Sequence, residues 1–280
     1  MRKLVILLFL LLGTRTFSIS DSLLQNKWFY SGVAGLNISQ IALDNWTQGG
    51  DNALAFTLLG NFEAKYVDSP WTFNNGLKLA FGRTKLGEDD FRTNDNEFYL
   101  ESILSYSFGW ALDSYFSNTV RTVISKGFNY KEVPAIQTSQ FFDPGYITQS
   151  IGFLYNRIPN FTTRLGIAFQ ETITNKFPFY SDDPSTPNEK EKFRFDTGVE
   201  SVSEAMFNIE ENVLFGSKLR LFSRFNELDV WDVRWDNLIT AQISKYFNVN
   251  FNVLLIYEKK QSPKTQLKEA LQLGITYTLF

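Results

Sequence analysis

Apolar and polar residues alternate along most of this chain, and the alternation is clearest in residues 266–280. From Leu271 to Leu279 every second residue is apolar or aromatic, whereas Gln272 and Thr276 are among the residues between them. A period of two is that of a β-strand with one apolar and one polar face. The pattern therefore predicts a half-polar strand in this segment.

The same alternation recurs in segments that are bounded by turn-forming Asn, Asp, Gly and Pro residues. About 12 such segments are present, each close to the roughly 9 to 11 residues with which a tilted strand crosses a bilayer. The predicted strands are residues 32–43, 53–66, 71–84, 95–108, 113–124, 146–155, 161–174, 193–208, 216–225, 230–244, 248–257 and 266–280.

These strands predict an all-β fold, a closed antiparallel transmembrane β-barrel of about 12 strands. Closure pairs the last strand with the first and removes the exposed edges, and an even strand number closes antiparallel. Long connections after the third, fifth and seventh strands place the long loops outside the cell and both termini in the periplasm. Lys268, Gln272 and Thr276 then face the lumen. A soluble periplasmic β-sandwich is the alternative, but it lacks the even, membrane-length repeat.

Residues 1–20 have the features of a secretory signal peptide. Basic residues precede an apolar run, and Ser18 and Ser20 supply small residues before a cleavage site ahead of Asp21. Arg15 lies in the cleavage region and leaves the exact site open. No Pro- or Ser-rich linker follows, so residues 21–280 are expected to form a single outer-membrane barrel domain.

The chain contains 28 Phe, 12 Tyr and 6 Trp, an aromatic content that fits strands with one face in lipid. Outer-membrane lipid is therefore the first expected partner. Tryptophans near strand ends are expected to form a girdle at the interface between lipid and water. The girdle residues are Trp28, Trp46, Trp71, Trp110 and Trp231.

The chain has no histidine and no cysteine. A histidine general base and the common zinc and copper ligands are therefore lacking, so we expect no enzyme, no cofactor and no metal centre. A net charge of −3 excludes a generally basic surface, and with it nucleic acid as a partner. Two acidic loop groups, residues 88–90 and 182–183, offer oxygen ligands to calcium. Solvated loop charge is the favoured interpretation, because no EF-hand spacing is present.

Charged residues on the polar parity of the strands face the lumen in this fold. Turns centred near Asn212 and Leu228 would place opposite charges side by side on neighbouring strands. One interpretation is that these charges fill and stiffen the lumen, and the other is that they form a constriction that selects solutes. The first is favoured because a barrel of this size has little free lumen. The predicted pairs are Glu204 with Arg220, Arg220 with Asp236, Glu200 with Arg224 and Arg224 with Asp232, and Arg234 completes the charge lattice.

The stretch 36–52, LNISQIALDNWTQGGDN, resembles the opening of a Bacteroidetes outer-membrane family defined by a domain of unknown function (domain of unknown function 3078). The resemblance continues through Tyr66, Trp71, residues 142–146 and residues 219–257. It implies an outer-membrane barrel, but it supplies no catalytic residue and no substrate. The residues that carry the motif are Ser39, Gln40, Leu43, Asn45, Trp46, Gly49, Gly50 and Asn52.

Tyr277, Leu279 and Phe280 are expected to form the signal that the barrel assembly machinery reads. Outer-membrane barrels usually place the terminal aromatic residue on the apolar parity, with Tyr third from the end. Here Tyr277 is fourth from the end and Phe280 falls on the polar parity. Either a bulge precedes Phe280, or Leu279 takes the usual place with one residue added.

Two non-enzymatic functions remain. The first is a narrow channel or transporter for small solutes, which requires a continuous water path past Arg220 and Arg224. The second is an accessory or scaffolding barrel subunit of a cell-envelope complex, which binds other envelope proteins through its loops or periplasmic turns. A plugged lumen favours the second.

Overall fold

The computed structural model describes residues 27–280 apart from 46, 48–49, 184–185 and 187. The predicted signal peptide and Trp46 lie outside these residues. Among the described residues, no helix has the length and apolar character needed to cross a membrane. The strands are β1 (Lys27–Ile41), β2 (Ala53–Asp68), β3 (Trp71–Leu86), β4 (Arg92–Ser107), β5 (Asp113–Thr122), β6 (Gly127–Asn129), β7 (Ile136–Ser139), β8 (Gly145–Tyr155), β9 (Phe161–Ile173), β10 (Phe193–Glu210), β11 (Val213–Arg224), β12 (Trp231–Gln242), β13 (Phe247–Tyr257) and β14 (Gln266–Thr278).

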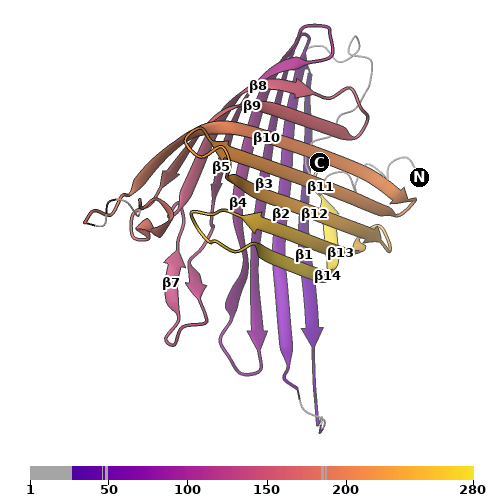
Figure 1. Ribbon diagram of the computed structural model, residues 1–280. Coiled ribbons are helices and arrows are strands. Elements are labelled where there is room, and N and C mark those ends of the chain that lie inside the picture. Colours follow the sequence, from indigo (N-terminus) through magenta and orange to yellow (C-terminus); the bar gives the residue numbers. More distant parts are fainter. Residues whose placement is uncertain (1–26, 46, 48–49, 184–185, 187) are drawn as a thin grey trace.

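Twelve of these strands form one closed antiparallel barrel, in which each strand pairs with its neighbours and β14 pairs with β1 (Figure 1). The predicted closed antiparallel β-barrel of about 12 strands is confirmed. The two remaining strands, β6 and β7, pair only with each other in the connection between β5 and β8. The alternation did not predict this hairpin, because strands of three and four residues are too short to show a period.

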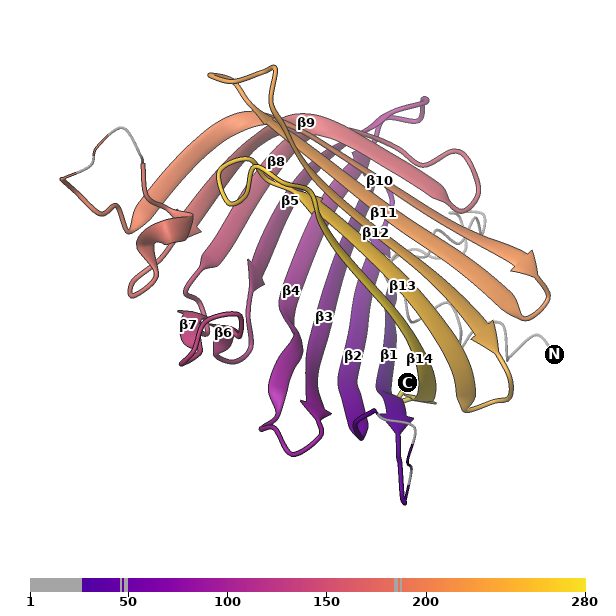
Figure 2. The same ribbon diagram turned by 60° about the horizontal axis from the view of Figure 1, so that its bottom comes forward.

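The connections fall into two groups at opposite ends of the barrel (Figures 1 and 2). The loop end carries the connections β1–β2, β3–β4, β5–β8, β9–β10, β11–β12 and β13–β14. A 3₁₀ helix, η3 (Pro178–Tyr180), lies in the β9–β10 connection. The turn end carries the five remaining connections, and two of these contain only residues 69–70 and 211–212. The start of β1 and the end of β14 also lie at the turn end.

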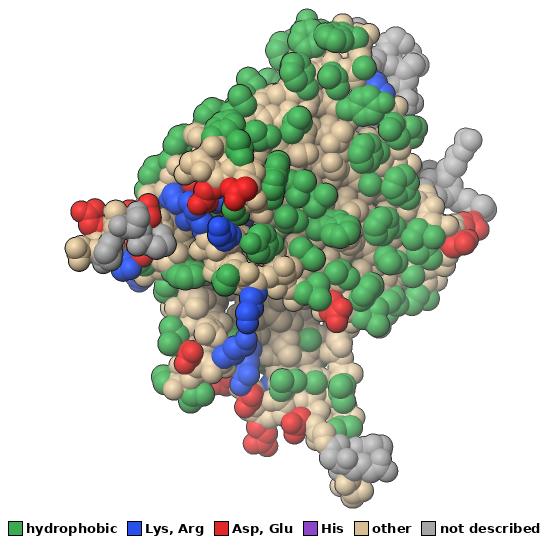
Figure 3. All heavy atoms as spheres, in the orientation of Figure 1, with side chains coloured by type: hydrophobic (Ala, Val, Ile, Leu, Met, Phe, Trp, Pro, Cys, Tyr) green, Lys and Arg blue, Asp and Glu red, His purple; other side chains and the backbone are tan. Residues whose placement is uncertain are grey.

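The outer wall of the barrel is apolar (Figure 3). Neighbouring residues of β9 illustrate the alternation, since Leu165 is 58% exposed and Arg164 is 6% exposed. Leu271 and Tyr277 of β14 are likewise exposed, whereas Thr276 is buried. The side chains that sequence parity assigns to lipid therefore lie on the outside, and a lipid environment would cover them.

Aromatic side chains form a belt around part of the turn end. Trp28 stacks on Tyr30 at 5.8 Å between ring centroids, and the Trp71 and Tyr106 rings lie 4.8 Å apart. Trp110, in the turn between β4 and β5, continues the belt and is exposed. Trp231, which begins β12, is exposed at the loop end instead. The four described tryptophans of the predicted girdle thus lie at or beside strand ends.

The seam between β14 and β1 explains the offset at Phe280. Strand β14 ends at Thr278, and the last two residues continue along β1 through bonds from the Leu279 N–H to the Gly32 carbonyl (2.8 Å) and from the Gly32 N–H to the Phe280 carbonyl (3.2 Å). A Cβ atom on Gly32 would lie 2.9 Å from Cζ of Phe280. Because Gly32 has no side chain, the Phe280 ring fits against it on the outer face. Phe280 lies beyond the end of β14, so the alternation of that strand does not decide its direction.

Apolar side chains fill the interior near the turn end. Ile103, Tyr115 and Leu154 form a buried cluster on β4, β5 and β8. Leu214, near the start of β11, has no exposed surface. The buried Tyr115 hydroxyl forms a hydrogen bond with the Ser150 hydroxyl at 2.7 Å, because a buried hydroxyl group needs a hydrogen-bond partner. This part of the turn end is therefore closely packed, and buried polar residues such as Asn248 and Thr240 lie beside it.

Candidate functional site

The middle of the lumen is filled by ion pairs, and Glu101 is the centre of one group. Glu101 of β4 is 5% exposed and pairs with Arg164 of β9 and, at 2.8 Å, with Lys218 of β11. Lys218 also pairs with Glu204 of β10 at 2.9 Å and bonds the Tyr99 hydroxyl at 3.2 Å. Because buried charges are costly when they lack partners, these groups hold one another in place.

A second group connects the two opposite walls of the barrel. One carboxylate oxygen of Glu97, on β4, lies 2.5 Å from the Arg234 guanidinium on β12, and the other lies 3.2 Å from Lys78 on β3. Lys78 in turn lies 3.2 Å from Asp236 on β12. Five strands separate β4 from β12 in either direction around the ring. These side chains therefore meet across the width of the lumen.

Arg224 organises a third group nearer the loop end. It is 1% exposed and pairs with Asp232 at 2.8 Å and with Asp196 at 3.1 Å. Next to it, Arg220 donates to Glu200 at 2.7 Å and to the Gln170 side chain at 2.9 Å. Arg224 is therefore inaccessible to solvent, whereas the Arg220 side chain is 20% exposed.

The predicted register of the charge lattice is wrong by two residues. Glu204 lies opposite Lys218 and not opposite Arg220, which faces Val202 and Arg234. Asp236 likewise faces Lys218. The predicted pair of Glu200 with Arg224 is replaced by Glu200 with Arg220. Of the four predicted pairs, Arg224 with Asp232 is present as an ion pair, although Asp232 lies opposite Phe222.

Local turn geometry accounts for the shift. The register of β10 and β11 changes between Asn208 and Glu210, so β10 carries one extra residue before its turn. Phe222 pairs with Asp232, which centres the next turn on Glu227 instead of Leu228. Moving a turn centre by one residue moves each cross-strand partner by two. A bulge of this kind leaves no signal in the alternation.

Amide side chains from the strands at the closing seam form a separate buried network. Asn250 donates to Asn37 at 3.2 Å and to Asn248 at 2.7 Å, and Asn37 donates to Gln272 at 3.1 Å. A Cβ atom on Gly274 would lie 2.1 Å from the Asn248 side-chain oxygen. The network therefore requires glycine at this position.

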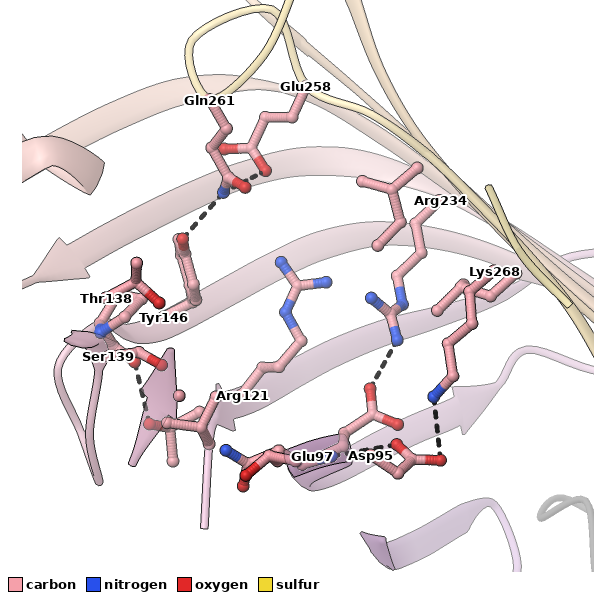
Figure 4. Close-up of a pocket in the computed structure, with 18 of the residues that line it drawn as sticks. Asp95, Glu97, Arg121, Thr138, Ser139, Tyr146, Arg234, Glu258, Gln261 and Lys268 are labelled. Atoms are coloured by element: carbon pink, nitrogen blue, oxygen red, sulfur yellow. Dashed lines mark hydrogen bonds and ion pairs between the residues drawn. The ribbon is translucent and has the colours of Figure 1, made fainter. Parts of the chain in front are cut away.

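A chamber of about 410 Å³ lies between the ion pairs and the loop end. Figure 4 shows its labelled residues converging from opposite walls, with Arg121 projecting between Tyr146 and Arg234. Gln261, in the β13–β14 connection, donates to the Tyr146 hydroxyl at 2.8 Å and to Glu258 at 2.6 Å. The chamber is thus lined by charged and hydrogen-bonding groups.

Glu258 is a buried acid of the chamber with a raised pKa. It follows the last residue of β13, outside the spanning strands, and is 7% exposed. Burial, together with the neighbouring negative charge of Asp232, raises the pKa of its carboxyl group. Sequence reasoning missed Glu258 and Gln261. Glu258 falls on the same alternating positions as Asn248 and Asn250, which point inward, so extending the alternation by one residue past β13 would have predicted it. Gln261 lies in a loop, where side chains do not alternate.

The acidic loop groups that were considered for calcium have basic partners instead. Asp89 pairs with Arg92 at 2.8 Å, and Asp182 pairs with Lys190 at 2.6 Å. In the part of the chain that the structure describes, no group of three or more acidic residues is arranged to hold a metal ion.

One family model matches part of the chain. Residues 38–128 match the family described as Protein of unknown function (DUF3078). It is the domain of unknown function that the motif in residues 36–52 resembles, so the resemblance to this domain is confirmed over the matched residues. The match does not extend to residues 219–257, where the resemblance was also expected. No curated protein matches the sequence.

Several solved structures share the barrel type. An outer membrane channel from Pseudomonas putida F1 is 10% identical, with a TM-score of 0.41, over 95% of this chain and 99% of that one. The translocator domain of the autotransporter NalP from Neisseria meningitidis is 9% identical, with a TM-score of 0.37, over 99% and 93%. The porin KdgM is 8% identical, with a TM-score of 0.31, over 89% and 99%. These likenesses are to the barrel as a fold and extend to no activity.

Proposed function

We propose that the protein is a non-enzymatic outer-membrane barrel that binds small solutes in its loop-end chamber and is closed to free diffusion in this state. The observation that carries the proposal is the contact between Arg234 and Glu97, which joins opposite walls at 2.5 Å. The volume of the chamber, about 410 Å³, lies in the range of small-molecule sites. Passage of a solute would require this pair and its neighbours to separate.

The apolar outer wall supports a place in the outer membrane. In the orientation that we propose, the loop end faces the outside of the cell, and both termini lie in the periplasm. The chamber would then be filled from outside. The barrel assembly machinery would insert the chain after removal of residues 1–20.

Conductance in planar bilayers tests the closed lumen. We expect the purified full chain to show no constitutive conductance steps at neutral pH, because ion pairs and apolar side chains fill its middle and turn end. A variant with Glu97→Gln and Arg234→Gln removes the cross-lumen pair, and we expect brief openings from it. Steady porin-like conductance of the unmodified chain would contradict the proposal.

An accessory or scaffolding role is the second candidate, and exposed apolar residues at the loop end favour it. Val133 is 97% exposed, and Ile136 and Phe141 are also exposed, in or beside the β6–β7 hairpin that projects from the barrel (Figure 1). We expect an envelope protein that copurifies after gentle extraction to be lost in a variant with Val133→Asp and Ile136→Asp. Copurification that is unchanged in this variant would exclude the hairpin as the docking site.

A further inference from the structure

Arg121 is the cation of the chamber that has no acidic partner. It lies near the end of β5, opposite Tyr99 and Tyr146 on the neighbouring strands. Its guanidinium lies 5.0 Å from the centroid of the Tyr146 ring, and it makes no hydrogen bond or ion pair with any described residue. In Figure 4 it projects into the open space of the chamber.

The other three cations that line the chamber all have carboxylate partners. Arg220 pairs with Glu200 at 2.7 Å, Arg234 with Glu97 at 2.5 Å and Lys268 with Asp95 at 3.0 Å. A guanidinium is charged at every physiological pH and presents a planar fork of donors. One such fork in this chamber therefore remains available to a ligand.

The charges around Arg121 limit the negative charge that a ligand can carry. Charges of both signs surround Arg121: the Arg234 and Arg220 guanidinium groups repel it, and the Glu258 and Glu97 carboxylates attract it. An anion bound here would be attracted by all three guanidinium groups. Acids in the wall, Asp232 and Glu258 among them, would oppose a doubly charged ligand such as phosphate. Four acids and four bases line the chamber, so its positive charge for a ligand is that of the unpaired Arg121 alone, and a single carboxylate matches this charge and the guanidinium fork.

We propose that the chamber binds small solutes that carry one carboxylate, and that the Arg121 guanidinium receives this group through two parallel hydrogen bonds. The inference rests on the proposed function, because it assigns a ligand class to the same chamber. The Tyr146 ring would support the guanidinium from one side. The remaining volume of the chamber would accommodate the apolar part of the solute.

Equilibrium dialysis of the detergent-purified full chain against radiolabelled butyrate tests this assignment. Butyramide, which has nearly the same shape and no charge, is the matched competitor, and inorganic phosphate and ethylammonium are the other competitors. Arg121→Gln removes the charge, and Arg121→Lys keeps the charge but loses the fork. Lys245→Gln, at an exposed position in the β12–β13 turn, is the matched control.

We expect butyrate to bind the unmodified chain and the Lys245 variant equally. Binding should weaken about tenfold or more in Arg121→Gln and less in Arg121→Lys. Equal binding to all four proteins, no butyrate binding at all, or stronger competition by phosphate or ethylammonium than by unlabelled butyrate would overturn the inference. Conductance is measured separately, so a conducting chain that still binds butyrate through Arg121 would contradict only the closed lumen.

Discussion

The guanidinium of Arg234 and the carboxylate of Glu97 meet at 2.5 Å although their strands, β12 and β4, stand on opposite sides of the barrel. Both oxygens of Glu97 are engaged, since the second lies 3.2 Å from Lys78. The groups that would give an open pore its selectivity are thus paired with one another. The proposal of a closed lumen therefore depends on these side chains staying paired.

Glu101→Gln should lower the free energy of unfolding by about 3 to 5 kcal/mol, because it leaves Arg164 and Lys218 without this carboxylate in a buried site. Denaturant-induced unfolding in lipid vesicles measures the change. Asp89→Asn, which breaks the exposed loop pair with Arg92, is the matched control and should cost less than about 1 kcal/mol. Equal losses in the two variants would show that the lumen is well solvated.

The strands were predictable because alternate side chains in a barrel wall face lipid and lumen. The starts of β2, β3, β5, β9 and β10 coincide with the predicted starts. The inward direction of Arg220 and Arg234 also follows from parity alone. Long, half-apolar strands give the strongest periodic signal that a sequence contains.

The partners of these charges were not predictable. Parity states that Glu97 and Arg234 both face inward, but the width of the lumen depends on strand number, tilt and stagger. Contacts between opposite walls therefore have no local signature. The bulge before Glu210 also displaced the expected pairs of Glu204. The chamber depends in addition on Gln261, which a loop positions.

Gly274→Ala should destabilise the barrel by about 1 to 3 kcal/mol, because the added methyl group would overlap the amide network. Its Cβ atom would lie 2.1 Å from the Asn248 oxygen and 2.6 Å from the Asn250 nitrogen. Gly76→Ala is the matched control, since nothing lies within 4 Å of its Cβ position. Unfolding in vesicles compares the two variants. The interpretation fails if both substitutions change stability by the same amount.

Glu258→Gln should stabilise the barrel increasingly as pH rises. Burial raises the pKa of Glu258 in the folded chain above its ordinary value of 4.5. The protonated Glu258 carboxyl group therefore contributes its full stabilisation below pH 4.5. This stabilisation is lost as pH rises through the raised pKa of the folded chain. Glutamine does not titrate and retains an oxygen that can accept the bond from Gln261.

The free energies of unfolding of Glu258→Gln and the unmodified chain are to be compared between about pH 4 and pH 8. The advantage of the variant should be small at the acidic limit and largest at the basic limit. Glu211→Gln, at an exposed position in the β10–β11 turn, makes the same chemical change outside the chamber and is the matched control. A pH-independent difference for Glu258→Gln would show that its carboxylate is well solvated.

Deletion of Phe280 should reduce the amount of folded barrel in the membrane, because its carbonyl and ring both complete the seam at Gly32. Gly32→Val should act in the same direction, since its side chain would displace the ring. Phe247→Ala, another exposed aromatic at the turn end, is the matched control. Heat-modifiable migration of the membrane fraction on gels reports the folded share. Normal folding without Phe280 would instead assign the assembly signal to Leu279 or to an internal segment. If the defect only equals that of Phe247→Ala, Phe280 acts through general contact with lipid.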